Sequence, residues 1–268
     1  MKLLKDLTYG VNILELKGST NIAIDHVAFD SRKVLKFSLF IAIRGTQVDG
    51  HHYIDKAVQS GAVCIVCEKL PENIQEDVTY IVVKNTAKAL GLIASNYFDN
   101  PSEKIKLIGV TGTNGKTTSV TLLFHLFRLL GFKVGLLSTV ENRIHNQVVP
   151  STHTTPSSLE INELLYKMIE KGCQYAFMEV SSHSIDQHRI SGLKFQIGVF
   201  TNITRDHLDY HKTFDNYIAA KKAFFDVLPT DAFALYNVDQ KHGETMVLDT
   251  NAKPVSYGMN SVCDYKVK

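Results

Sequence analysis

The stretch GVTGTNGKTT, residues 109–118, combines glycines at every third position with a final Gly-Lys-Thr. The common phosphate-loop pattern, G-x-x-x-x-G-K-[ST], requires a glycine at position 110, where this chain has Val110. An apolar run, residues 105–110, precedes the loop and a run of helical spacing follows it, which is the setting that a phosphate loop requires. Glycines let backbone N–H groups face an anion, while Lys116 can reach outer phosphates and Thr117 can ligate Mg²⁺. We interpret this stretch as a variant phosphate-binding loop rather than a glycine-rich turn with a surface lysine.

Glu179 lies near the end of a second apolar run, YAFMEVS at residues 175–181. A carboxylate at the carboxyl end of a parallel strand shares the sheet edge with the loop and can hold Mg²⁺ there, although a solvated glutamate is the alternative. The next residues include Ser182, His183 and an aspartate, so we also considered a Ser-His-Asp hydrolase. Adjacent residues rarely satisfy that geometry, and no G-x-S-x-G elbow is present, so we disfavour this function.

Three other positions carry polar groups that could do chemistry. We expect Pro156 to open a helix. The two threonines before it, Thr154 and Thr155, would then form an anion-binding site at the helix N-terminus, a simple N-cap, or both. Lys221 adjoins Lys222 on an expected helix and, taken alone, indicates a solvated pair. A further segment supplies a carboxylate and histidine cluster that could suggest zinc, although an ATP site favours Mg²⁺ and hard oxygen ligands: Asp206, His207, Asp209 and His211.

Composition and charge narrow the class of protein. Of the 268 residues, 44% are hydrophobic and 21% are charged, which is typical of a globular chain with room for a sizeable core. The net charge of +2 gives no indication of a broad nucleic-acid or membrane surface. Because no apolar run approaches the ~20 residues of a membrane span and the N-terminus lacks a signal-peptide pattern, we expect a cytoplasmic protein. Cys64 and Cys67 lie in an apolar run, which favours buried, reduced thiols over a metal or redox pair.

Alternating strand and helix patterns predict an α/β protein with mostly parallel sheets. We expect a small α/β N-terminal domain over residues 1–100 and a P-loop-type central domain over residues 101–268, joined by a linker at residues 99–104. The expected strands are 38–43, 62–68, 79–83, 105–110, 134–139, 175–181, 196–203 and 232–238. The expected helices are 53–61, 86–98, one from residue 118 to near Gly131, 157–171 and 214–227.

Several segments resemble the Mur ligase family, whose members use ATP to convert a carboxylate to an acyl phosphate that an amine then attacks. Besides the phosphate loop they are DSRKVLKFSLFIAIRGTQVDGHHYI (30–54), THTTPSS (152–158), MEVSSHSIDQHRI (178–190), TNITRDHLDYH (201–211), YIAAKKAFF (217–225) and YNVD (236–239). These segments keep the order that the family has and span nearly the whole chain. One departure is Phe37, where relatives usually have a glycine, and it concerns the shape of a turn rather than the chemistry.

The resemblance implies a role for each matching residue. Residues implied to bind ATP are Thr111, Gly112, Thr113, Asn114, Gly115, Lys116, Thr117, Thr118 and, at the adenine, Asn237. Residues implied to hold Mg²⁺ are Thr117, Glu179, His207 and a carbamylated Lys221, and those implied to be catalytic are Lys116, Glu179, His207 and Lys221. Residues implied to bind the UDP-sugar peptide are Ser31, Thr46, Gln47, Val48, Thr154, Thr155, Ser181, Gln187 and Arg189. His211 is expected to be structural.

The family branch with the nearest motifs adds a diamino acid to UDP-N-acetylmuramoyl-L-alanyl-D-glutamate in peptidoglycan synthesis. The resemblance therefore implies ATP and Mg²⁺ as cofactors, meso-diaminopimelate in preference to L-lysine, and a monomer. It also implies that the central domain is incomplete and that the family's C-terminal ligase domain is absent from this sequence. Two alternatives remain, a ligase like folylpolyglutamate synthase and a non-catalytic nucleotide-binding module. The first should not need the DSR segment or the SSHSIDQHR segment, and the second would hydrolyse or hold ATP without needing a carboxylate substrate.

Overall fold

The computed structural model describes residues 1–45, 48–149 and 156–267. Its contacts divide the chain into two compact units, Met1–Asn100 and Pro101–Lys268. The expectation of a linker over residues 99–104 is wrong for its second part. Those residues form the short helix α4 (Pro101–Lys104), which packs against α6 (Ser158–Glu170) in the second unit. The backbone before α4 turns at Asp99 and Asn100, whose φ angles are 61° and 51°.

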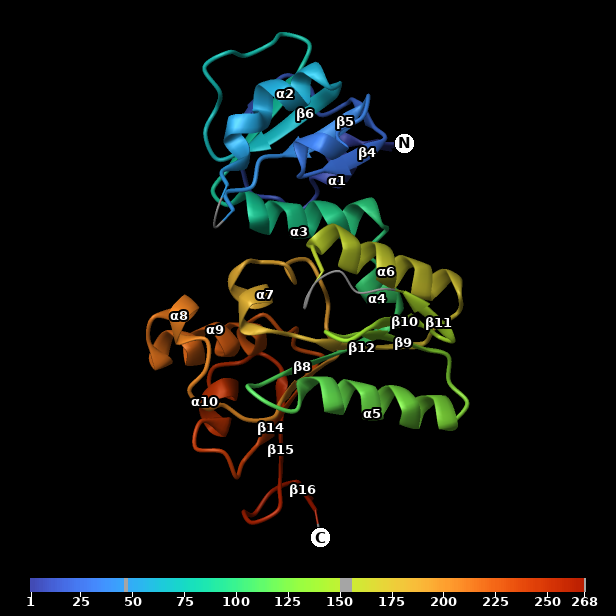
Figure 1. Ribbon diagram of the computed structural model, residues 1–268, viewed down its shortest axis with the longest axis vertical. Helices are drawn as coiled ribbons and strands as arrows, with labels where there is room; N and C mark the ends of the chain where they lie inside the picture. The colour runs from blue at the N-terminus through green and yellow to red at the C-terminus, as the bar shows by residue number, and fades with distance from the viewer. Residues whose placement is uncertain (46–47, 150–155, 268) are drawn as a thin grey trace. The chain divides into compact units, whose positions relative to one another are not determined.

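The first unit contains a five-stranded sheet in the order β2-β7-β6-β5-β4 (Figure 1). Four of its strands are parallel, namely β4 (His26–Ala28), β5 (Ser38–Ile41), β6 (Ala62–Cys67) and β7 (Thr79–Val83). β2 (Ile13–Lys17) pairs antiparallel with β7, and β1 (Lys2–Leu3) and β3 (Ala23–Ile24) form a separate pair. The helical elements are α1 (Leu4–Leu7), α2 (Ile54–Gln59), α3 (Thr86–Tyr97) and two 3₁₀ turns at Ser31–Lys33 and Gly50–Tyr53.

The second unit contains a nine-stranded sheet in the order β11-β10-β9-β12-β8-β13-β14-β15-β16. Its seven parallel strands are β8 (Lys106–Thr111), β9 (Val134–Leu137), β12 (Tyr175–Glu179), β13 (Ile197–Phe200), β14 (Phe233–Asn237), β15 (Lys253–Gly258) and β16 (Tyr265–Lys266). The antiparallel hairpin β10 (Asn142–Ile144) and β11 (Gln147–Val149) extends one edge. The other helices are α5 (Lys116–Leu129), α7 (Ser182–Asp186), α8 (Leu208–His211), α9 (Phe214–Asp226) and α10 (Gly243–Val247).

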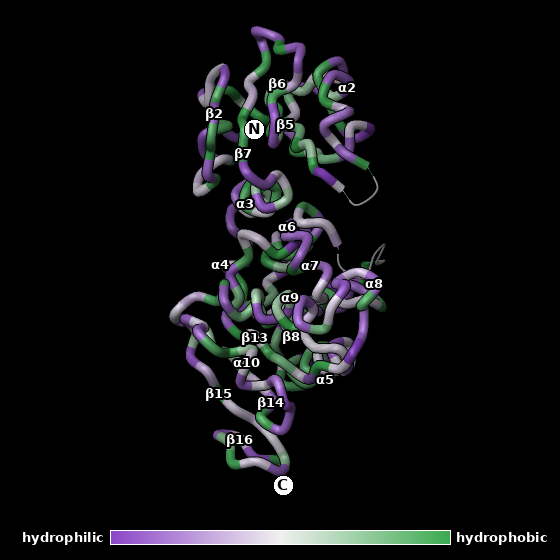
Figure 2. Tube along the Cα trace, turned by 90° about the vertical axis from the view of Figure 1, so that its left-hand side faces the viewer, coloured by the Kyte–Doolittle hydropathy of each residue, from purple (hydrophilic) through white to green (hydrophobic). Residues whose placement is uncertain are grey.

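The residues of β8 pack into two different hydrophobic cores. Val110 packs with Phe124 of α5 in one core, whereas Leu107 belongs to the larger core that includes residues of α6 and α9. Figure 1 shows α5 and α6 on opposite faces of this sheet, and Figure 2 shows hydrophobic residues in green along β8 and α5. β8 is therefore buried on both faces, which holds the loop after it on a rigid strand.

The predicted α/β class with mostly parallel sheets is confirmed. One correction to a helix boundary concerns Pro156, which does not open α6. Ser157 is instead the N-cap, and it forms a capping box with Glu160, whose carboxylate accepts a hydrogen bond from the Ser157 N–H at 2.8 Å. Cys64 and Cys67 are buried and free, as expected, and burial raises the pKa of both thiols.

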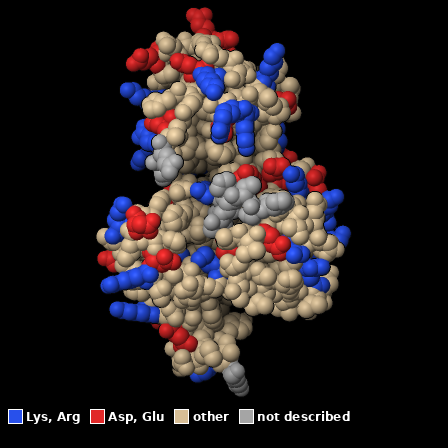
Figure 3. Space-filling model, in the orientation of Figure 1, with Lys and Arg blue, Asp and Glu red and all other residues tan. Residues whose placement is uncertain are grey.

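Lysine, arginine and carboxylate side chains are interspersed on the face of each unit that Figure 3 shows. Within the residues that the structure describes, no helix is long and apolar enough to cross a membrane.

Candidate nucleotide and metal site

Close packing requires two of the glycines in residues 109–118, and a left-handed backbone conformation favours the third. A side chain at Gly109 would meet Phe224 at 2.6 Å, and one at Gly112 would lie 2.0 Å from the Thr201 hydroxyl. Gly115, the N-cap of α5, has a φ of 85°, a left-handed conformation that costs glycine nothing. Val110, at the position where the common pattern has its first glycine, is fully buried in the core beneath α5. The variant spacing therefore reflects close packing around the loop.

Two residues at the end of β13 fix the shape of the loop. The Asn202 side chain accepts from the Asn114 N–H at 3.0 Å and donates to the Asn114 carbonyl at 3.0 Å. The Thr201 hydroxyl donates to the same carbonyl at 2.8 Å, and the Thr113 N–H donates to the Asn202 carbonyl at 2.9 Å. These two residues were not predicted as site residues, because their contacts with the loop span roughly a third of the chain.

Two lysines converge on the Gly112 carbonyl. Lys116 Nζ donates to it at 3.0 Å and to the Thr113 carbonyl at 2.9 Å, and Lys221 Nζ donates to it at 2.9 Å. Burial, and then the charge of Lys116, lower the pKa of Lys221 to about 7. Lys221 is only 1% exposed, so the interpretation of a solvated lysine pair is wrong for it, whereas Lys222 forms a partly exposed ion pair with Asp226.

Glu179 ends β12 between the strands that carry the two neighbouring loops. Its carboxylate accepts from the Thr117 hydroxyl at 3.0 Å, the Thr139 N–H at 2.8 Å and the Thr139 hydroxyl at 3.1 Å. Glu179 is 4% exposed, and within the described residues no lysine, arginine or histidine forms an ion pair with it. A buried carboxylate beside a hydroxyl, held by neutral donors alone, is a donor set that suits Mg²⁺.

His207 lies at the N-cap of α8 with a φ of 52°. Its ring contacts that of His183 at 4.9 Å and that of Tyr217 at 6.1 Å between centroids, and the Tyr217 hydroxyl lies 3.2 Å from the Thr113 hydroxyl. His211 is buried and shares a 3.0 Å hydrogen bond with Ser182. In the described parts of the chain, no three His, Cys, Asp or Glu residues form a group that could hold a metal ion.

The residues predicted to grip the sugar-peptide surround α7. Ser181 is its N-cap and accepts from the Ser184 N–H at 3.1 Å. Arg189 donates to the Gln187 carbonyl oxygen Oε1 at 2.6 Å, and Gln187 donates to the Tyr210 hydroxyl at 3.3 Å. Burial lowers the pKa of Arg189. Because Gln187 links Arg189 to Tyr210, a ligand that bound one of these three side chains would also move the other two.

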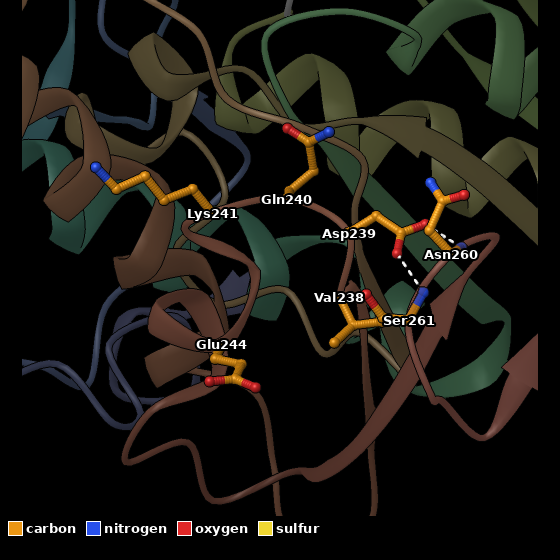
Figure 4. Close-up of a pocket in the computed structure, with 7 residues that line it drawn as sticks. All are labelled: Val238, Asp239, Gln240, Lys241, Glu244, Asn260 and Ser261. Atoms are coloured by element: carbon orange, nitrogen blue, oxygen red, sulfur yellow. Dashed lines mark hydrogen bonds between the residues drawn. The ribbon is translucent and has the colours of Figure 1, made fainter.

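Asn237 ends β14, and its amide already bridges two strand ends. It donates to the Thr201 carbonyl at 3.1 Å and accepts from the Asp239 N–H at 3.0 Å, which leaves one amide N–H for a ligand. A pocket of about 380 Å³ lies next to it, lined by Val238, Asp239, Gln240, Lys241, Glu244, Asn260 and Ser261. Figure 4 shows the Asp239 carboxylate facing the backbone of Asn260 and Ser261, whose N–H groups donate to it at 3.1 and 2.9 Å.

Other predicted residues divide into those that the structure describes and those that it does not. Ser31 is buried at the start of a 3₁₀ turn that Asp30 caps, and a hydrogen bond from Arg32 lowers the pKa of Asp30 to about 2. Val48 is 55% exposed, Thr118 is exposed, and the buried Thr111 hydroxyl has no hydrogen-bond partner among the described residues. The predictions for Thr46, Gln47, Thr154 and Thr155 lie outside the described residues.

Comparison with known families supports this interpretation of the loop. The Mur ligase middle domain matches residues 110–268, and a second profile, described as Mur ligase family, catalytic domain, matches residues 23–98. The first match covers more than half of the chain, so the chain belongs to the Mur ligase family and the predicted resemblance is confirmed.

Relatives that are named as ligases align with almost all of this chain. A UDP-N-acetylmuramoyl-L-alanyl-D-glutamate--2,6-diaminopimelate ligase from Cytophaga hutchinsonii is 56% identical over 99% of the chain and 55% of the relative. The ligase of the same name from Parabacteroides distasonis is 54% identical over 99% of the chain and 54% of the relative. The chain thus spans about half the length of the curated relatives that it matches.

Solved structures share the fold. A structure of UDP-N-acetylmuramoyl-L-alanyl-D-glutamate--2,6-diaminopimelate ligase superposes with a TM-score of 0.81 at 23% identity, covering 99% of this chain and 54% of that one. The Acinetobacter baumannii ligase that is named for adding D-alanyl-D-alanine gives a TM-score of 0.60 at 20% identity, over 97% of this chain and 53% of that one.

Proposed function

We propose that this chain provides the ATP and UDP-sugar sites of a ligase that adds a diamino acid to UDP-N-acetylmuramoyl-L-alanyl-D-glutamate in peptidoglycan synthesis. Meso-diaminopimelate is the favoured amine, because the relatives are named as diaminopimelate ligases. The observation that carries the proposal is the phosphate loop joined through Thr117 to the buried carboxylate of Glu179. Because its ATP supply and its proposed nucleotide-sugar substrate are cytoplasmic, we place the enzyme in the cytoplasm, acting as a monomer.

The phosphate site is formed by the loop and by the N-terminus of α5. Backbone N–H groups of residues 111–118 cradle the phosphates, and Lys116 leaves its carbonyl partners to bind the outer phosphates as a point charge. The remaining amide N–H of Asn237 contacts the adenine.

The residues that would hold Mg²⁺ are Thr117, Glu179, His207 and a carbamylated Lys221. Bound Mg²⁺ would offset the negative charge that develops on the transferred phosphoryl group. The amine of Lys221, with a pKa of about 7, is partly neutral near pH 7. The neutral amine is the form that adds CO₂, so burial converts a basic side chain into the precursor of an anionic ligand.

The substrate carboxylate attacks the γ-phosphorus and ADP leaves, after which the amine attacks the acyl phosphate and phosphate leaves. Arg189 binds a carboxylate or phosphate of the UDP-sugar peptide through its planar fork, and Ser181 and Gln187 position it together with Thr154 and Thr155. Ser31, Thr46, Gln47 and Val48 bind the uridine end. Catalysis is mainly positioning and charge neutralisation.

A ligase like folylpolyglutamate synthase is the second candidate, and substrate binding separates the two. We expect calorimetry to detect binding of UDP-N-acetylmuramoyl-L-alanyl-D-glutamate to the chain, and no heat with dihydropteroate. Arg189→Lys should weaken UDP-dipeptide binding, because lysine cannot form the bidentate pair. Binding of dihydropteroate without binding of the UDP-dipeptide would contradict the proposal.

A non-catalytic nucleotide-binding module is the third candidate. It would hydrolyse or retain ATP at a rate that does not depend on a carboxylate substrate. We expect the UDP-dipeptide to stimulate phosphate release from ATP, and an unchanged rate would favour the module.

A further inference from the structure

We propose that Thr139 is a positioning residue that orients Glu179 for its metal ion, a role that rests on the proposed function. Thr139 donates to both carboxylate oxygens, with its N–H on Oε1 at 2.8 Å and its hydroxyl on Oε2 at 3.1 Å. One residue that binds both oxygens fixes the rotation of the carboxylate plane, which a single hydrogen bond would leave free.

The topology explains why this contact exists. β12 lies between β9 and β8 in the sheet, and all three strands are parallel. Their carboxyl ends therefore share one edge, with Glu179 in the middle, Thr117 on the β8 side and Thr139 two residues past the end of β9. Thr139 follows β9, which lies on the side of β12 away from β8. It can therefore hold Glu179 without occupying the phosphate loop that follows β8.

The hydrogen bonds of the carboxylate show what changes when a metal binds. Glu179 uses three acceptor positions, two for Thr139 and one for the Thr117 hydroxyl. A hydroxyl that ligates a cation does so through its oxygen lone pair, so Thr117 can turn from Glu179 to the metal while both Thr139 bonds persist. Outer partners of this kind typically change metal affinity by about 10–100-fold.

The neighbouring Ser138 provides a matched control. Ser138 is buried in this turn, whereas Thr139 is exposed, and the Ser138 hydroxyl donates to the Glu141 carbonyl at 2.9 Å rather than to Glu179. Removing it weakens the turn, whereas Thr139→Val removes the hydroxyl bond to Glu179 and retains both the backbone N–H and the branched shape. Thr139→Ser restores the hydroxyl.

The experiment measures the Mg²⁺ concentration for half-maximal binding of a fluorescent, non-hydrolysable ATP analogue. Binding of Mg²⁺ to the free analogue is common to all variants, so differences report the protein. We expect Thr139→Val to raise the midpoint about tenfold, and Thr139→Ser and Ser138→Ala to stay within about twofold, the scatter we allow for substitutions away from the metal. Thermal melts of each variant check that it is folded.

A Thr139→Val midpoint equal to that of the wild type would overturn the role of Thr139, as would a Thr139→Ser variant no better than Thr139→Val. An equal shift in Ser138→Ala would assign the effect to the turn and also overturn it. These results leave the proposed function standing. A wild-type chain that bound the analogue with no dependence on Mg²⁺ would instead remove the metal site and contradict both proposals.

Discussion

The two units of this chain are both α/β, yet they bury different kinds of polar group. Among the described residues, the buried polar side chains of the first unit are all hydroxyls: Thr8, Ser31, Ser38, Thr79, Thr86 and Ser95. The second unit also buries a carboxylate, an imidazole and an amine, those of Glu179, His211 and Lys221. Burying ionisable groups costs free energy, so their concentration at one sheet edge marks a place where function outweighs stability.

In the first unit, by contrast, one group of charged side chains forms ion pairs among its own members. His51 is bonded to Asp49 at 2.6 Å through Nδ1 and accepts from the Glu68 N–H at 2.8 Å through Nε2. At the surface, Arg44 forms ion pairs with the carboxylates of Asp49 and Glu68. Glu179 and Lys221 make no such ion pairs among the described residues. A closed network stabilises a fold, whereas a buried charge that lacks a counter-ion is available for a ligand.

The largest predicted effect concerns Lys116→Ala. Removing the ammonium should weaken binding of an ATP analogue with Mg²⁺ by about 3 kcal/mol, roughly 100-fold, because a hydrogen-bonded charge opposite the phosphates is lost. Isothermal titration calorimetry measures this, with Lys104→Ala, in the short helix before β8, as the control. Unchanged affinity would mean that the loop is not the phosphate site.

Lys221→Met should stabilise the second unit by about 2 kcal/mol at pH 7, because it removes a buried amine whose pKa lies well below that of an exposed lysine. Between pH 7 and about 10.4 the unfolded wild type binds a proton that the folded form releases, so wild-type stability rises with pH across that window. The advantage of the variant should therefore be largest at or below pH 7 and shrink toward pH 10.

Urea denaturation in CO₂-free buffer at several pH values measures the effect, with Lys222→Met as the matched control. A Lys221→Met variant that is less stable than the wild type at pH 7 would show that the amine stabilises the fold. ¹³C NMR of the wild type in labelled bicarbonate with Mg²⁺ should show a carbamate signal that Lys221→Met lacks.

The smallest predicted effect concerns the first unit. Phe37 has a φ of 61° and is 51% exposed, so a side chain is held in a left-handed conformation. Phe37→Gly should stabilise the unit by about 0.5–1 kcal/mol, since the relief of strain exceeds the added freedom of the unfolded chain. Chemical denaturation measures it, and nucleotide affinity should not change. A loss of stability would show that the exposed ring packs usefully.

The sequence was most informative where pattern and packing agree. β7 has the predicted bounds, and β8, the loop and α5 occur in the predicted order, because a fully buried strand is a continuous apolar run. The hairpin of β10 and β11 was missed because its strands are three residues long and its outer strand is largely exposed. β2 is also mostly exposed, so its residues show no clear alternation.

The site was predicted unevenly for a related reason. Lys116 and Thr117 follow a local pattern, and Glu179 is the last residue of an apolar strand. Thr139 is linked to Glu179 across 40 residues, and its role depends on β9 lying next to β12, which is a property of the strand order. A polar residue within two positions after each parallel strand is the signal that could have identified it.

Hydrogen exchange with and without a non-hydrolysable ATP analogue and Mg²⁺ tests the contrast between the two units most directly. We predict slower exchange in residues 109–118, 137–141 and 201–207, at the carboxyl edge of the sheet in the second unit. The first unit, including residues 38–53, should exchange at the same rate in both conditions. Protection in the first unit with none in residues 109–118 would contradict the assignment of the nucleotide and metal site to the second unit.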